Sequence, residues 1–171
     1  MTEPARRVVT GHDANGKSVV LSDGPPPQQH SMRGREVGAD FFEMWSVIKP
    51  VPALTSTEPR EPTEREFTIM PVSGHLFRVI DIFPTHMGGK RTVMHRTKTL
   101  DYAVVIEGEV VLVLDDSEVV LRKSDVVVQR GTIHAWENRS NSVARMAFFH
   151  IDADFSPELL AKLPQPLDLM R

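Results

Sequence analysis

The sequence predicts an all-β protein, a sandwich or barrel built from many short strands. Two observations support this prediction. Short apolar runs recur from residue 66 onward with turn-forming residues between them, and only one stretch, near the end, carries the signals of a helix. Short strands at this spacing are typical of sandwiches and barrels, whereas strands that alternate with helices would indicate parallel βαβ units.

The first 65 residues are broken by turn signals and predict an N-terminal extension. Asn15-Gly16 lies between two short apolar runs, which predicts a hairpin. Pro25 to Pro27 then end any regular element. Residues 41–48 are a further candidate strand, and the proline-rich residues 49–65 predict an irregular connection. We expect the extension to pack on the main body or on a partner subunit.

The rest of the chain predicts the barrel itself and a short C-terminal helix. The candidate strands are residues 66–70, 76–83, 90–97, 102–107, 109–114, 119–122, 126–129, 133–138 and 143–151. Ser156 is a helix N-cap, Pro157 suits the first helical position, and the helix is expected to end near Lys162. The predicted organisation is therefore an extension at 1–65, a barrel at 66–155, and a helix with a tail at 156–171.

Composition narrows the class of protein. A length of 171 residues favours a single domain, and an apolar content of 40% argues against global disorder. A net charge of −3 without a basic patch argues against nucleic-acid binding. The chain has no cysteine, no signal-peptide pattern and no apolar run long enough to span a membrane. We expect a soluble, cytoplasmic protein.

Two of the predicted strands place polar residues on common faces, because side chains alternate with period two along a strand. In the strand at 90–97, Arg91, His95 and Thr97 share one face. In the strand at 133–138, His134 and Trp136 share a face in the same way. If the histidines point inward, these residues line one cavity, and a cavity with apolar walls and a few polar groups suits a small organic ligand.

Two histidines and one carboxylate can hold a divalent metal ion. His95, His134 and Asp101 supply this set, which suits iron, manganese or zinc and leaves coordination positions open for substrate. Asp101 either binds the ion directly or accepts a hydrogen bond from one of the imidazoles and so orients it. Thr97 is a poor neutral ligand and is expected to hold a water molecule or a substrate atom. Trp136 is a core residue or a platform against which a ligand stacks.

The spacing of these residues resembles the two motifs of the cupin superfamily. In the first motif, G-x5-H-x-H-x3/4-E-x6-G, Gly89, His95 and Gly108 match. Asp101 stands at the glutamate and Thr97 at the second histidine. The second motif, G-x5-P-x-G-x2-H-x3-N, is matched by a further set of residues, namely Gly131, His134 and Asn138, with Gln129 at the proline and Ser124 near the first glycine.

The resemblance implies a double-stranded β-helix, or jelly-roll, barrel. In the family, both histidines of the first motif, its glutamate and the histidine of the second motif bind a metal ion, and two of these four positions are altered here. The resemblance also implies a homodimer. We expect residues 5–22 or 41–48 to contribute to the interface, for example by adding a strand to a neighbour's sheet.

Three functions follow from this pattern. The first is a metal-dependent enzyme, an oxygenase, decarboxylase or isomerase, with His95, His134 and Asp101 as its catalytic residues. Its alternative is a barrel without metal that binds a small molecule and performs no catalysis. The third is an interaction role for the extension, which is compatible with either. His150 shares a face with the apolar residues of its strand, and we expect it at the surface end of that strand.

Overall fold

The computed structural model describes residues 1–35, 37–49, 51–54, 65–69, 74–167 and 169. These residues form strands and two short helices along the chain. Their order is β1 (Arg7–His12), β2 (Ser18–Gly24), β3 (Gln28–Ser31), β4 (Ala39–Val47), β5 (His75–Ile82), η1 (Thr85–Met87), β6 (Thr99–Glu107), β7 (Glu109–Val113), β8 (Glu118–Arg122), β9 (Val126–Arg130), β10 (Ala135–Glu137), β11 (Ala144–Asp152) and α1 (Pro157–Leu160). The predicted all-β class is confirmed.

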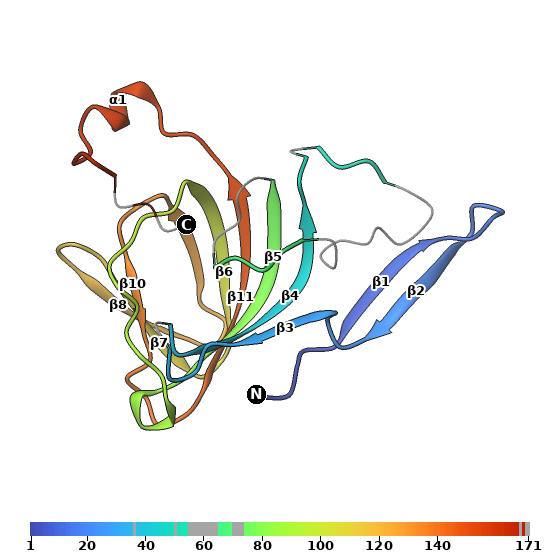
Figure 1. The fold of residues 1–171 in the computed structure, drawn as a ribbon, viewed down its shortest axis with the longest axis horizontal. Coiled ribbons are helices and arrows are strands. Elements are labelled where there is room, and N and C mark those ends of the chain that lie inside the picture. The colour runs from blue at the N-terminus through green and yellow to red at the C-terminus, as the bar shows by residue number, and fades with distance from the viewer. Residues whose placement is uncertain (36, 50, 55–64, 70–73, 168, 170–171) are drawn as a thin grey trace.

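Two sheets face each other and together form the barrel (Figure 1). The larger has six strands in the order β3-β4-β5-β11-β6-β9, and the smaller has three in the order β10-β7-β8. The pairs formed by β4, β5, β11, β6 and β9 within the larger sheet are all antiparallel. A separate two-stranded sheet, β1-β2, projects from the barrel beyond β4 (Figure 1), and Arg7 at its start donates to the Met44 carbonyl of β4 at 3.3 Å.

Alternation along the strands of the larger sheet decides which side chains enter the barrel. In β6, Asp101 and Ala103 are buried, whereas Tyr102 between them is 42% exposed. In β11, Phe148 and His150 are buried, whereas Phe149 between them is 39% exposed. The inner face of this sheet therefore mixes apolar residues with a few polar ones, and the outer face is partly open to solvent.

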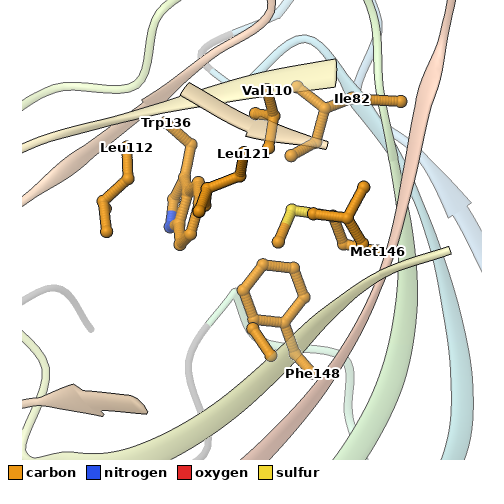
Figure 2. Packing of buried hydrophobic residues seen from close by; sticks show 10 residues of the cluster. Ile82, Val110, Leu112, Leu121, Trp136, Met146 and Phe148 are labelled. Atoms are coloured by element: carbon orange, nitrogen blue, oxygen red, sulfur yellow. The ribbon is translucent and has the colours of Figure 1, made fainter. Parts of the chain in front are cut away.

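The barrel core joins the two sheets. Val110, Leu121 and Trp136 from the smaller sheet meet Met146 and Phe148 from the larger one, and Figure 2 shows these side chains converging between the strands. Trp136 makes edge-to-face contacts with Phe148, with ring centroids 5.6 Å apart. Contact of this kind between the sheets fixes the width of the barrel, and with it the position of the polar residues farther along the same strands.

The N-terminal extension contributes directly to the larger sheet. β4 pairs with β3 on one edge and with β5 on the other, so both of its edges are satisfied within the chain. The segment before β1 lies on the outer face of that sheet, where the Thr2 amide donates to Asp40 at 2.9 Å and Ala5 packs on an apolar cluster around Phe42. The homodimer stays a prediction.

Some expected elements differ from those observed. β3 begins directly after the three prolines, where we expected no regular element, because its residues pair with β4. Residues 90–97 form no continuous strand and contribute two isolated bridges, an antiparallel one between His95 and His134 and a parallel one between Arg96 and Leu169. The described residues 65–69 are not a strand, while residue 70 and most of 49–65 lie outside the described part of the chain.

The C-terminal helix is shorter than predicted. It covers Pro157–Leu160, with the Ser156 hydroxyl accepting a hydrogen bond from the Leu159 amide as the N-cap pattern predicts. No described helix combines the length and the apolar character needed to cross a membrane.

Candidate active site in the barrel cavity

A cavity of about 70 Å³ lies between the two sheets, inside the barrel. Its wall is apolar over most of its area and polar in one region. The apolar residues are Val37, Ala39, Phe41, Ile69, Ile80, Ile82, Trp136 and Phe148, and the polar ones are Arg78, Thr92, His95, Thr97, Asp101, Gln129, His134 and His150. The volume is several times what one water molecule requires, so the cavity admits a compact organic molecule.

His95 and His134 lie side by side at the seam where the chain segment before β6 meets the segment before β10. Their main chains form an antiparallel bridge, in which the His95 amide donates to the His134 carbonyl at 2.9 Å and the reverse bond is 2.8 Å. The centroids of the two imidazole rings are 4.3 Å apart. Both side chains are buried. The backbone therefore fixes the spacing of the rings before any ligand is present.

Each imidazole is anchored through the same ring nitrogen. His95 Nδ1 lies 2.8 Å from the Val93 carbonyl, and His134 Nδ1 lies 3.0 Å from the Thr132 carbonyl. A carbonyl only accepts, so Nδ1 of each ring must carry the proton and donate it. This leaves Nε2, on the far side of each ring, with a free lone pair, which is how metal-binding histidines are held in proteins.

Gln129 braces the second of these rings. Its Nε2 donates to the Thr132 carbonyl at 3.2 Å, the same oxygen that His134 Nδ1 uses, and it also contacts the Thr132 hydroxyl. The distance from Gln129 Nε2 to His134 Nδ1 is 3.3 Å. Both nitrogens are donors in this arrangement, so they do not hydrogen-bond to each other. They lie close together because both donate to the Thr132 carbonyl.

Burial keeps both imidazoles neutral near pH 7. Loss of hydration and, to a smaller extent, the neighbouring His95 together lower the pKa of His134 to about 4. Burial also lowers the pKa of His95, against smaller upward contributions from the Val93 carbonyl and from Asp101. Neutral imidazoles are the form that binds metal ions, so the environment favours ligation over protonation.

Asp101 lies beside a histidine that the motif does not include. His150 Nδ1 is 2.9 Å from Asp101 Oδ1, and both side chains are almost fully buried. The two atoms are not aligned for a straight hydrogen bond, and neither has another partner among the described residues. Thr97 Oγ1 is likewise buried without a described partner. The polar region of the cavity thus holds several atoms whose hydrogen-bonding capacity is unused.

A buried ion pair closes the cavity on the side of β4 and β5. Arg78 Nη2 lies 2.9 Å from Glu43 Oε1, at an angle that departs from a straight hydrogen bond, and the side chains are 1% and 3% exposed. Arg78 also donates to the carbonyls of Thr68 and Ile69. Burial lowers the pKa of Arg78, and Glu43 opposes that shift. The opposite charges of Arg78 and Glu43 balance each other, and the hydrogen bonds from Arg78 hold residues 68–69 against the barrel.

The structure brings five of the six predicted site residues together. His95, His134, Asp101, Thr97 and Trp136 all line the cavity. Arg91, which we expected beside them, is exposed and does not line it.

Arg91 points elsewhere because its segment is not a regular strand. The Trp136 amide donates to the Thr92 hydroxyl and the Thr92 amide donates to the Trp136 carbonyl, so that Thr92 faces inward in place of its neighbour. The expected alternation of inward and outward side chains fails over these residues, and with it the prediction for Arg91.

The expectation for His150 was wrong, and Arg78 and Gln129 were not singled out. All three lie on the inner face of the larger sheet. His150 is 6% exposed, because β5 and β6 flank its strand on both sides. A signal for Arg78 was present in the sequence, since it alternates inward with the apolar residues Leu76 and Ile80 of the same strand.

Comparison with known proteins agrees with this geometry. The family model for the cupin domain matches residues 83–151. The chain is also 30% identical over 152 residues to the Cupin-domain-containing oxidoreductase fogC of Aspergillus ruber, which covers 86% of this chain and 72% of that protein. The chain belongs to the cupin superfamily.

Two further similarities agree with this assignment. It is 35% identical over 154 residues to Phomopsin biosynthesis cluster protein C' of Diaporthe leptostromiformis, covering 86% of this chain and 78% of that protein. The cupin domain of Schizosaccharomyces pombe Cnp3 has a similar structure, with a TM-score of 0.50 over 94% of this chain and 95% of that chain at 13% identity. The latter likeness concerns the double-stranded β-helix fold alone.

Proposed function

We propose that this cupin is a small-molecule enzyme of the oxidoreductase type, with a divalent metal ion held in the barrel by His95 and His134. The observation that carries the proposal is the matched anchoring of the two rings, whose Nδ1 atoms donate to backbone carbonyls and whose Nε2 lone pairs are left free. The name of the Aspergillus ruber relative favours oxidation among the reaction types that the sequence left open.

The donor set fits a divalent ion held by two imidazoles. The described residues contain no cluster of three or more histidine, cysteine, aspartate or glutamate side chains placed to hold an ion. Asp101, which we expected as the third ligand, lies against His150, and Thr97 offers only a neutral hydroxyl. The proposal therefore assigns the remaining coordination positions to water and substrate. When bound, such an ion supplies a Lewis-acid centre with free positions and, if it is iron, redox chemistry.

The other residues of the cavity serve the substrate in this proposal. The apolar wall formed by Phe41, Ile80 and Phe148 binds the body of a small organic molecule and excludes water from it. Thr97 Oγ1, which has no partner among the described residues, is available to donate a hydrogen bond to a substrate oxygen. The polar and apolar regions together orient the molecule with its reacting end toward the histidines.

A cavity without metal that only binds a small molecule is the second candidate. It is favoured by one observation, namely that only two of the four metal-binding positions of the family, those of His95 and His134, carry the family's usual residue. Under this alternative, the free Nε2 atoms of His95 and His134 accept hydrogen bonds from the ligand. The two candidates make opposite predictions for metal content.

Elemental mass spectrometry of the full chain, purified without chelator or nickel resin, decides between them. We expect near-stoichiometric iron, manganese or zinc in the wild type, and a loss of more than about tenfold in His95→Ala and His134→Ala. His86→Ala is the matched control, because His86 is exposed and lies outside the cavity wall. Wild-type protein that remains free of metal after reconstitution with each ion would overturn the proposal, as would a His134→Ala variant that keeps its metal.

A further inference from the structure

A second pair of titratable side chains occupies the cavity on the wall formed by the larger sheet. Asp101 on β6 and His150 on β11 are direct cross-strand partners, and Gln129 on β9 is the next residue in the same row. Directly opposed residues on one face of a sheet have side chains within contact distance. The register of the barrel therefore builds the pair, independently of the bridge that joins His95 to His134.

The far nitrogen of this histidine has nothing to bond within the described chain. His150 Nδ1 faces the Asp101 carboxylate at 2.9 Å, whereas Nε2 is buried without a described partner. The ring lies parallel to Phe148, with centroids 5.7 Å apart, so an apolar ring lies against one of its faces. A buried polar atom without a partner costs free energy, and most such atoms in folded proteins are satisfied. The geometry indicates that a ligand or water supplies the missing contact.

The other charges around His150 are already balanced. Arg78, on β5 at the next inward position, is paired with Glu43. His95 and His134 are neutral because burial lowers their pKa values. The Asp101 carboxylate is thus the one charged group in direct contact with His150 among the described residues, at 2.9 Å.

We propose that His150, oriented by Asp101, accepts a proton from a weakly acidic hydroxyl of a compact aromatic or enolic substrate. The substrate class follows from the cavity, which is small and largely apolar and which offers one polar region. The place of this step in catalysis rests on the proposed function, whereas the proton transfer itself requires no metal ion. Asp101 acts through His150 and is a positioning residue.

The step balances without any further reactant. The O–H bond of the substrate breaks, its electron pair stays on the oxygen, and the proton forms an N–H bond with His150 Nε2. Nδ1 keeps its proton and donates it toward Asp101, whose negative charge stabilises the imidazolium. The resulting phenolate or enolate lies in the same cavity as the free nitrogens of His95 and His134. A metal ion held by these nitrogens would bind the negatively charged oxygen more readily than the neutral hydroxyl.

The test uses 4-nitrophenol as the probe, because its phenolate absorbs visible light and its phenol does not. The full chain is mixed with the probe at a pH at which the free probe is mostly protonated. We expect the wild type to bind it and to increase the phenolate absorption. In His150→Gln, which cannot accept the proton, we expect the probe to bind without that increase. In Asp101→Asn we expect the ratio of bound phenolate to phenol to fall by about tenfold or more.

Two controls separate this proposal from the proposed function. 4-Nitroanisole, which has no acidic proton, should bind the wild type and His150→Gln alike. Wild-type protein treated with chelator should keep the phenolate signal, because the proton transfer requires no metal ion. A signal lost with chelator but kept in His150→Gln would overturn the role of His150 while supporting the metal site.

A second measurement covers the case of a misfolded variant. In wild-type protein labelled with ¹⁵N-histidine, addition of 4-nitrophenol should convert the His150 ring to the form protonated on both nitrogens. Failure of the wild type to bind the probe, or a ring that stays neutral when the phenolate forms, would overturn the proposal.

Discussion

The buried ion pair between Arg78 and Glu43 gives the sharpest prediction for stability. Glu43→Leu removes the carboxylate, roughly fills its space and leaves the guanidinium buried and uncompensated. Removal of one partner from a buried pair costs about 3–5 kcal/mol. The carbonyls of Thr68 and Ile69 still accept from Arg78, so we expect the lower end, about 3 kcal/mol, which corresponds to a fall of about 10 °C in Tm.

Urea unfolding followed by tryptophan fluorescence measures this loss, and two further variants test its cause. Replacement of both partners, Glu43→Leu with Arg78→Met, should recover most of the stability, because an apolar pair of similar volume is often as stable as a buried ion pair. Glu118→Leu is the matched control, since Glu118 pairs with Arg139 at the exposed surface and its loss should matter far less. If Glu43→Leu unfolds within about 0.5 kcal/mol of the wild type, or if the double variant is no better than the single one, the reasoning is wrong.

Two further predictions concern stability. Burial lowers the pKa of His134 to about 4, so the unfolded chain, in which a histidine titrates near 6.5, takes up its proton first as pH falls. In the presence of chelator, the contribution of His134 to the free energy of unfolding should fall by about 3 kcal/mol between pH 6.5 and 4. In His134→Gln, the free energy of unfolding should therefore depend less steeply on pH over this range. Gly89→Ala would place a Cβ 1.6 Å from the Phe83 carbonyl oxygen, so we expect thermal unfolding to show a loss above about 3 kcal/mol, whereas Gly24→Ala, with open space around it, should be neutral.

The sequence allowed the barrel and most of the cavity to be predicted because both depend on alternation within single strands. Alternation along β6 places Asp101 and Tyr102 on opposite faces, since the first is buried and the second exposed. The motif spacing likewise predicted that His95 and His134 meet, and their main chains do so in one bridge. Patterns of this kind depend on residues that are close together in sequence, so they can be recognised without knowing how the strands pair.

The errors arose where one chain segment depends on another. The prediction for Arg91 assumed a regular strand, but a hydrogen bond between Thr92 and the Trp136 amide replaces the strand pattern there. The partner of Asp101 could not be predicted because the register that places His150 opposite it joins strands almost fifty residues apart in sequence. β3 was missed because its strand exists through pairing with β4, while its own residues are polar and follow three prolines.

At the bridge between His95 and His134, the groups that close the barrel differ from the groups that carry its chemistry. The bonds that join the two chain segments use amide and carbonyl groups, which every residue except proline possesses, and the imidazoles contribute nothing to them. Either histidine can therefore be replaced without opening the seam. A descendant of this chain could lose its reactive groups one at a time and still fold, so that within such a lineage an intact barrel says little about whether a reaction survives.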